Sequence, residues 1–335
     1  MTFLARATGA WSRYFFTPAS AFDLGCSRAA FCTLAFLYYV TQDFSEWGTV
    51  AREFWMPIPL FAVPGIPLLP AGAIALLQIV FKAALALAAV GLFTRLALVV
   101  AFGCSVYLLG LPQNFGQIQH FDTLVVLVFG ILAMSRAGDA WSIDAWRRSR
   151  AAGRRGAATP LESGEYTWPI RAIWVMTAVI FFSAGVSKLR HSGLEWVFSD
   201  HLAIVLVRHQ YFVSDGEPLT SWGLAIAAYP WAPRLLAAIS LATEVCYPLA
   251  LFSRRARLVL VPAGIAFLVG IRLLMGPTFE PFVMCSVFWV PWTRVLAWFG
   301  ATRRSRAAAA QPVSGVPSPT LARTTARAAS RTSPP

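Results

Sequence analysis

The sequence PIRAIWVMTAVIFFSAGVSKL, residues 169–189, decides the fold class. It is an apolar run of about 20 residues, the length that a helix needs to cross the hydrocarbon core of a bilayer. Comparable runs of roughly 18–22 residues recur along the chain, and a globular core would break them up. We therefore predict an integral membrane protein built from helices.

The composition supports the same class. Of the 335 residues, 57% are hydrophobic and 13% are charged, and the mean hydropathy is +0.61. A soluble domain usually carries about 25% charged residues. The N-terminal segment 1–22 is interrupted by Arg6, Arg13 and Pro18, so it predicts neither a cleavable signal peptide nor a lipid anchor.

The fold class that we predict is all-α: a polytopic helical bundle of about eight membrane-spanning helices. The predicted spans are 24–42, 72–93, 95–112, 120–136, 169–189, 232–252, 258–275 and 281–299. Arginines cluster in alternate connections, at 147–155, at 254–257 and in the C-terminal tail. By the positive-inside rule, both termini are cytoplasmic and the chain is a multi-pass protein of the cell (plasma or inner) membrane.

The net charge of +13 is concentrated in these same connections, so it indicates anionic lipid rather than nucleic acid as the partner. We divide the chain into a transmembrane domain, residues 1–300, and a disordered basic tail, residues 301–335, which has low complexity and no apolar periodicity. The predicted exterior loops 43–71 and 190–231 are rich in aromatics. We expect a short surface segment in the first and an interfacial helix in the second.

Lys188 is the strongest candidate for a catalytic residue. Ala184 and Gly185 share its helix face, so a ligand or another helix can come close to the amine. Lys188 is either an anchor that reaches the headgroups or a general base, which requires a neutral amine. The topology places His120, at the start of the fourth span, at the same exterior level.

Three further charges lie within predicted spans. An unpaired charge near the centre of a bilayer costs about 3 kcal/mol or more, so such residues usually pair. We predict an ion pair between Lys82 and Glu244, either structural or part of a proton relay. We expect Arg272 to meet an anionic substrate group or a carboxylate.

No metal site is predicted. His191, His201 and His209 are separated by ten and eight residues, which matches no zinc motif. None of the five cysteines has a CxxC spacing, and we expect them to be small core residues.

Two short motifs resemble a known family. The segment Ala184–Leu189 followed by Trp196, and Gln119–His120 followed by Trp141–Asp144, are similar to segments of the vitamin K-dependent gamma-glutamyl carboxylases. The wider group is the HTTM family of bacterial membrane proteins, and the resemblance covers roughly residues 20–295.

The resemblance implies a catalytic role for two residues. In the carboxylases, the lysine that matches Lys188 deprotonates a vitamin K hydroquinone, and the histidine that matches His120 stabilises that chemistry. Oxygenation then gives a strong base that takes a proton from a glutamyl side chain, and the carbanion adds CO2, a lyase-type reaction. The implied cofactor is reduced vitamin K, a menaquinol-type hydroquinone, and we expect Arg272 and Trp196 to contact the substrate.

The sequence also departs from the family pattern. Ser187 stands where the carboxylases have a second lysine, and the spacer before Trp196 is longer. The tail does not resemble their large extracytoplasmic domain, so an extracytoplasmic protein partner is one expectation. Two function classes stay open: a carboxylase-like enzyme acting on a lipid-soluble quinol, and a transporter or immunity-type protein in which Lys82, Glu244 and Arg272 line a path.

Overall fold

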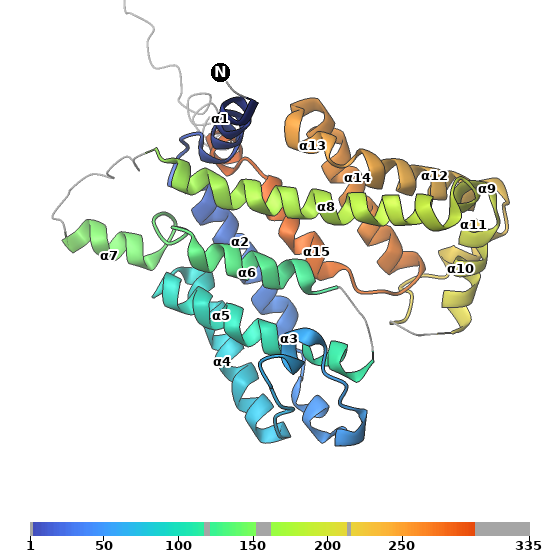
Figure 1. Ribbon diagram of the computed structural model, residues 1–335, viewed down its shortest axis with the longest axis horizontal. Coiled ribbons are helices and arrows are strands. Elements are labelled where there is room, and N and C mark those ends of the chain that lie inside the picture. Colours follow the sequence, from blue (N-terminus) through green and yellow to red (C-terminus); the bar gives the residue numbers. More distant parts are fainter. Residues whose placement is uncertain (1–2, 117–120, 152–161, 213–215, 299–335) are drawn as a thin grey trace, which may run out of the picture. The chain divides into compact units, whose positions relative to one another are not determined.

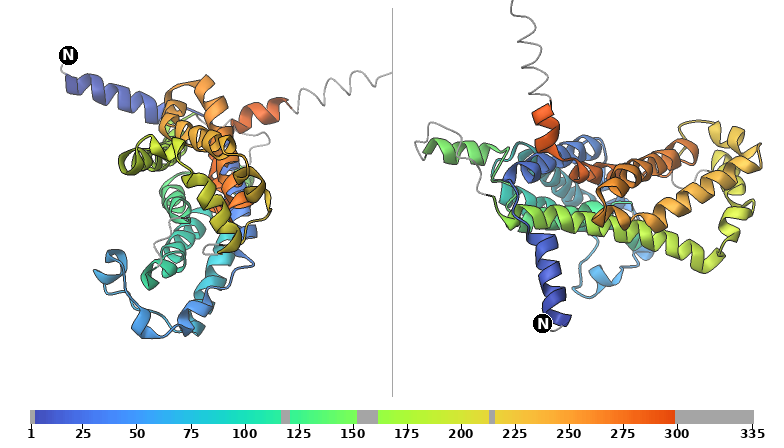
Figure 2. Two further views of the ribbon diagram at one scale, coloured as in Figure 1. Left: turned by 90° about the vertical axis from the view of Figure 1, so that its right-hand side faces the viewer. Right: turned by 90° about the horizontal axis from the view of Figure 1, so that it is seen from above.

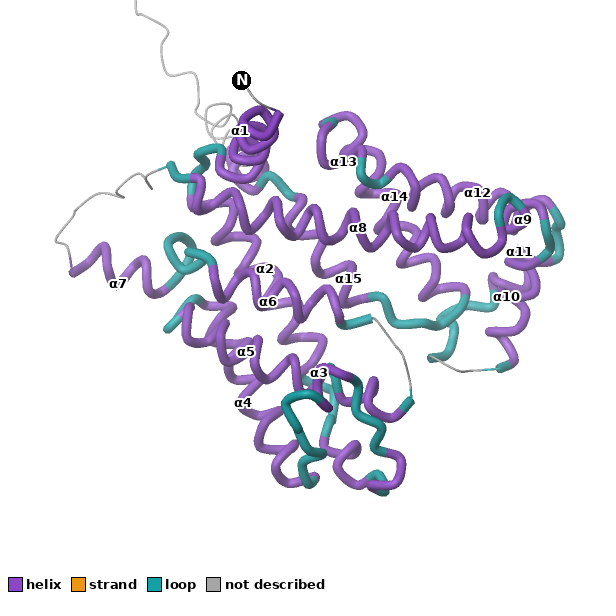
Figure 3. The backbone as a smooth tube through the Cα atoms, viewed as in Figure 1, coloured by secondary structure: helices purple, strands orange, loops and turns teal. Residues whose placement is uncertain are grey.

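The computed structural model describes residues 3–116, 121–151, 162–212 and 216–298. Over these ranges the regular structure is helical (Figure 3), apart from one isolated bridge between Ala19 and Ser163. The α-helices are α1 Phe3–Phe16, α2 Ala21–Tyr39, α3 Pro59–Ala62, α4 Ala71–Val90, α5 Thr94–Leu108, α6 Thr123–Met134, α7 Ile143–Ala151, α8 Thr167–Ser192, α9 Glu195–Phe198, α10 His201–Tyr211, α11 Trp222–Ala227, α12 Trp231–Cys246, α13 Leu249–Phe252, α14 Arg254–Leu274 and α15 Glu280–Met284. Short 3-10 helices are η1 Ser45–Thr49, η2 Arg52–Phe54, η3 Leu111–Phe115, η4 Gly164–Tyr166 and η5 Cys285–Trp289.

The chain divides into two units, Met1–Thr293 and Arg294–Pro335. The first contains all of the helices named above. The predicted tail, residues 301–335, lies outside the described residues, so its disorder stays a prediction.

Four helical segments in the described part of the chain are long and apolar enough to cross a membrane: Ala71–Val90, Thr94–Phe115, Gly164–Ser192 and Arg254–Leu274. Their outward faces carry large exposed apolar side chains, among them Leu76 and Ile79 on α4 and Leu258 on α14. Water would disfavour such faces, whereas lipid matches them. Over its described residues the structure confirms an all-helical fold with four candidate membrane-spanning helices, while the count of eight spans and the cytoplasmic termini stay predictions.

Six of the eight predicted spans agree with a single helix, within a few residues. The sixth is interrupted, because α12 ends at Cys246 and α13 begins only at Leu249. The eighth is wrong as a single helix over its described residues. It begins with α15 and η5, the chain is extended at Val290, and helical residues resume at 292–298. The interruption falls there because a residue before a proline, here Pro291, is driven out of the helical region.

The helices form two neighbouring groups within the first unit (Figure 1). In one group α4 packs against α2 and α5, and α5 packs against α6. In the other, α8 lies alongside α12, which also contacts α14; Figures 1 and 2 both show the pair α8 and α12 side by side. A buried aromatic cluster connects the first group to η5, since Phe31 on α2 contacts both Phe129 on α6 and Phe288 on η5.

A buried arginine fastens the end of α4. Arg28 on α2 is fully buried and donates to the carbonyls of Ala88 and Ala89, at 2.5 and 2.9 Å, and to that of Trp141. The last carbonyls of a helix have no partner within the helix and carry the negative end of its dipole. Arg28 therefore provides hydrogen-bond donors for the last carbonyls of α4 and holds the backbone at residue 141 beside them.

The motif Trp141–Asp144 has a structural role where α4 ends and α5 begins. Asp144 accepts hydrogen bonds from the backbone N–H of Phe93 and of Thr94, at 3.1 and 2.7 Å, and from the Thr94 hydroxyl at 2.8 Å. It thus caps the N-terminus of α5 from a distant segment. Gly91 has φ +72°, and a Cβ there would lie 2.3 Å from that of Ser142, so only glycine fits the contact.

Both predicted exterior loops contain short helices. Loop 43–71 includes η1, η2 and α3, and loop 190–231 includes α9, α10 and α11. Whether these helices lie at a membrane surface stays a prediction.

Candidate functional site

Lys188 and Glu244 form an ion pair where α8 meets α12. The Lys188 amine contacts both oxygens of the Glu244 carboxylate, with 2.5 Å to Oε2. The Glu244 side chain is only 3% exposed and that of Lys188 is 20% exposed. A buried carboxylate needs a partner, and the amine provides it. Lys188 is therefore not a free anchor but half of a buried pair.

A small residue permits this contact. Gly185 lies one turn before Lys188, and a Cβ at Gly185 would sit 3.0 Å from the Glu244 Cβ and 3.1 Å from the Val245 backbone nitrogen. The expectation that another helix approaches the face of Ala184 and Gly185 is confirmed, and that helix is α12.

Aromatic rings surround the amine. The Lys188 Nζ lies 5.3 Å from the centroid of the Trp196 ring and 5.7 Å from that of Phe267, within the range of a cation–π attraction. The Trp196 indole N–H is buried and has no hydrogen-bond partner. Trp196 thus lies beside the Lys188 amine with its indole N–H unpaired, and its contact with a substrate stays a prediction.

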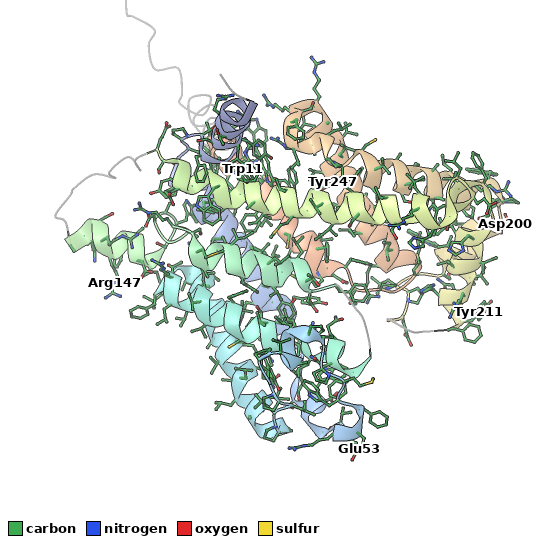
Figure 4. The ribbon with its side chains drawn as sticks, viewed as in Figure 1. Trp11, Glu53, Arg147, Asp200, Tyr211 and Tyr247 are labelled. Carbon is green, nitrogen blue, oxygen red and sulfur yellow. The ribbon has the colours of Figure 1, made fainter. Side chains whose placement is uncertain are left out.

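The amine and the carboxylate lie in the wall of a cavity of about 170 Å³. The other lining residues are apolar: Ile180, Phe181, Ala184, Phe267, Leu268, Ile271, Phe279 and Phe282. Phe181 also stacks on Tyr247, with ring centroids 4.2 Å apart, and Figure 4 labels Tyr247 next to α8. A titratable pair in an apolar cavity is the pattern expected of a binding or catalytic site.

A second, larger cavity of about 530 Å³ shares Leu268 and Phe279 with the first. Its lining is apolar except at one end, where Arg272 donates from Nε to Glu280 Oε1 at 3.0 Å. The Nη1 of Arg272 also donates to the carbonyls of Glu217 and Gly276. Of the two partners expected for Arg272, the structure shows a carboxylate. The other oxygen of Glu280, Oε2, is buried without a partner.

The predicted ion pair between Lys82 and Glu244 is wrong. Lys82 on α4 donates to the carbonyl of Gln42 at 2.7 Å, just beyond the end of α2, whereas Glu244 is paired with Lys188. A backbone carbonyl left over at a helix end is an adequate acceptor for an ammonium. The sequence held a signal for the true pair, because α8 and α12 correspond to the fifth and sixth predicted spans, and elements that follow one another along the chain are usually neighbours in space.

His120 lies outside the described residues, so its predicted position beside Lys188 is untested. Asp122, two residues later, accepts a hydrogen bond from the Tyr39 hydroxyl at 2.6 Å. Within the described residues no three His, Cys, Asp or Glu side chains come together as a metal site would require. The prediction of no metal stays a prediction.

These features define a helical membrane protein with a buried lysine–glutamate pair in an apolar cavity. The model of the HTTM domain matches residues 16–292, so the chain belongs to the HTTM family. The family suggested by the Lys188 motif is thereby confirmed. No curated protein and no solved structure matches the chain.

Proposed function

We propose that this HTTM protein is a multi-pass enzyme of the cell (plasma or inner) membrane that acts on a lipid-soluble hydroquinone, with Lys188 as the proton acceptor. The observation that carries the proposal is the place of the Lys188 amine, which lies in the wall of an apolar cavity against a carboxylate and an indole. Anchoring would need the amine to extend to the headgroups, whereas here it turns to Glu244.

The cavities suit a hydroquinone of the vitamin K type. The smaller has aromatic and aliphatic walls for a ring and one amine–carboxylate pair for a hydroxyl, and the larger has apolar walls for a hydrocarbon chain. When bound, such a hydroquinone supplies an oxidisable ring. The residues around Lys188 exclude water from that ring and orient its hydroxyl.

Glu244 is placed to exchange a proton with Lys188. An adjacent carboxylate favours the ammonium form of a lysine, whereas a general base must be neutral. The same carboxylate, however, is within hydrogen-bond distance of the amine and is the natural acceptor for its proton. In our proposal the neutral amine forms when the proton moves to Glu244, so the two residues act as one proton-accepting unit.

The alternative function, a transport path lined by Lys82, Glu244 and Arg272, gains no support from their contacts. Each takes a different partner: Gln42, Lys188 and Glu280 respectively. His120 remains in the proposal as a stabilising residue by family resemblance, and an extracytoplasmic protein partner remains the proposed source of any peptide-engaging surface.

The test is turnover in lipid nanodiscs with a panel of hydroquinones, followed by product epoxide. The variants are Lys188→Ala and Glu244→Gln, and the matched control is Lys82→Ala, which removes the same charge away from the cavity. We expect the control to keep the wild-type rate and both site variants to lose at least about a hundredfold, as for removal of a general base. Equal epoxide formation in wild type and Lys188→Ala, or none in either, would contradict the proposal.

A further inference from the structure

A second cluster, away from the Lys188 cavity, combines Tyr14, Arg171 and Arg257. They come from three elements: Tyr14 lies near the C-terminal end of α1, and the two arginines lie near the N-terminal ends of α8 and α14. In Figure 1 these three helix ends lie toward the same side of the first unit. The arginine pattern of the sequence predicts that side to be cytoplasmic.

The two arginines share one aromatic ring. The guanidinium carbon of Arg257 lies 4.1 Å from the centroid of the Trp174 ring, and that of Arg171 lies 4.4 Å from the same centroid. Two like charges held at one indole repel each other, and an anion bound between them would offset that repulsion. No carboxylate forms an ion pair with either arginine among the residues that the structure describes.

The donors of the cluster are only partly used. Arg257 donates from Nε and Nη2 to the carbonyls of Ala250 and Leu251, at the end of α13, so its Nη1 is uncommitted. Arg171 has no carbonyl or carboxylate acceptor within the described chain. The Tyr14 hydroxyl is buried and has no acceptor for its proton, and the indole N–H of Trp289, which stacks on Trp174, is likewise unpaired.

The surroundings of the cluster are those of a membrane surface. Exposed apolar side chains flank it, among them Phe252, 78% exposed, and Leu258, 69% exposed. Two more arginines, Arg254 and Arg255, are exposed on the first turn of α14. A site with cations on one side and lipid-facing residues on the other fits a ligand that carries an anionic head and an apolar tail.

We propose that Tyr14, Arg171 and Arg257 bind the phosphate group of an anionic membrane lipid. Guanidinium groups recognise phosphate oxygens through paired N–H donors, and the Tyr14 hydroxyl adds a further donor. The lipid, rather than a soluble phosphate, is the occupant because the site opens among lipid-facing side chains. This inference is independent of the quinol chemistry proposed above.

The test measures the thermal stabilisation of the detergent-purified full chain by added phosphatidylglycerol, phosphatidylcholine or inorganic phosphate. We expect phosphatidylglycerol alone to stabilise the wild type. Arg171→Gln is the test variant, because Arg171 holds no backbone carbonyl, and it should weaken the apparent affinity by about tenfold or more. Arg234→Gln, which removes an exposed arginine from the start of α12, is the matched control and should leave the affinity unchanged.

The shift in melting temperature on adding lipid is compared within each variant, so a variant that is less stable without lipid still gives a result. Arg171→Lys, which keeps the charge but not the planar fork, should bind with intermediate affinity. An equal phosphatidylglycerol effect in wild type and Arg171→Gln would overturn the site. Equal stabilisation by phosphatidylcholine or by inorganic phosphate would overturn its assignment to an anionic lipid.

Discussion

A Cβ atom at Gly185 would lie 3.0 Å from the Cβ of Glu244, closer than ordinary van der Waals contact allows without movement. The backbone of α8 at Gly185 therefore contacts the Glu244 side chain of α12, one turn before Lys188. This close approach brings the Glu244 carboxylate to the Lys188 amine. The ion pair of the candidate site thus depends on the absence of a side chain at position 185.

Replacing Gly185 with alanine should destabilise the protein by about 1–3 kcal/mol, as overpacking does in a close-packed interface. The added methyl group meets the backbone nitrogen of Val245 at 3.1 Å, which cannot rotate away as a flexible side chain can. Gly270→Ala on α14 is the control, because a Cβ there meets nothing within 4 Å. It should be neutral or stabilising by about 0.5–1 kcal/mol. Chemical unfolding in mixed micelles measures both, and equal effects of the two variants would refute the packing argument.

A double-mutant cycle should show that Lys188 and Glu244 are strongly coupled. Removing one partner leaves a buried charge uncompensated and should cost about 3–5 kcal/mol, whereas replacing both with apolar residues should cost much less. The cycle compares Lys188→Met, Glu244→Met and the double variant by the free energy of unfolding. Additive costs of the two single changes would show that the pair does not contribute as a unit.

The sequence predicted the face of this site but not its partner. Small residues at 184 and 185 beside Lys188 follow from helix periodicity alone, and the structure places α12 there. The position of Lys82 and Glu244 as charges within apolar runs favours a pair between them, but periodicity does not tell which helices are neighbours. Lys82 instead donates to the backbone carbonyl of Gln42. Every residue has a backbone carbonyl, so the residue types in a loop do not indicate which carbonyl will accept such a bond.

The interruption of helical structure after η5 is a second feature that the sequence pattern did not predict. Residues 281–299 are apolar enough to predict a span, yet the helical structure is interrupted at Val290 and Pro291, and Val290 is extended. Hydropathy over a window does not register the local effect of one proline. The role of Arg28 likewise has no signal in the sequence, since it depends on three carbonyls at distant positions in the chain.

Arg28→Met should therefore be among the most destabilising single changes in the chain. It removes the donor to the carbonyls of Ala88, Ala89 and Trp141, and each buried carbonyl left without a partner costs about 1–3 kcal/mol. We expect a loss of at least about 3 kcal/mol or failure to accumulate in the membrane. Arg95→Met is the matched control, because Arg95 is exposed at the start of α5, and its effect should stay within about 0.5 kcal/mol. Similar unfolding free energies for the two variants would contradict the role given to Arg28.

Asp144 should make the stability of the α5 end depend on pH in the acid range. Burial raises the pKa of Asp144, but hydrogen bonds from Thr94 and Phe93 outweigh burial and hold the pKa below its ordinary value. A carboxyl with a lowered folded-state pKa contributes stability above the unfolded pKa of about 3.9, and that contribution is lost as the pH falls through the folded pKa. Asp144→Ala should cost about 0.5–2 kcal/mol at pH 6, as for loss of a helix cap.

The difference in unfolding free energy between wild type and Asp144→Ala should therefore shrink between pH 4 and pH 2, because the wild-type carboxyl becomes protonated and caps α5 less well. Asp200→Ala serves as the control, since Asp200 forms an exposed pair with Arg234 and such pairs contribute about 0–1 kcal/mol. If the difference in unfolding free energy between wild type and Asp144→Ala stays constant down to pH 2, the negative charge of Asp144 contributes nothing. The hydrogen bonds of the side chain alone would then stabilise the N-terminus of α5.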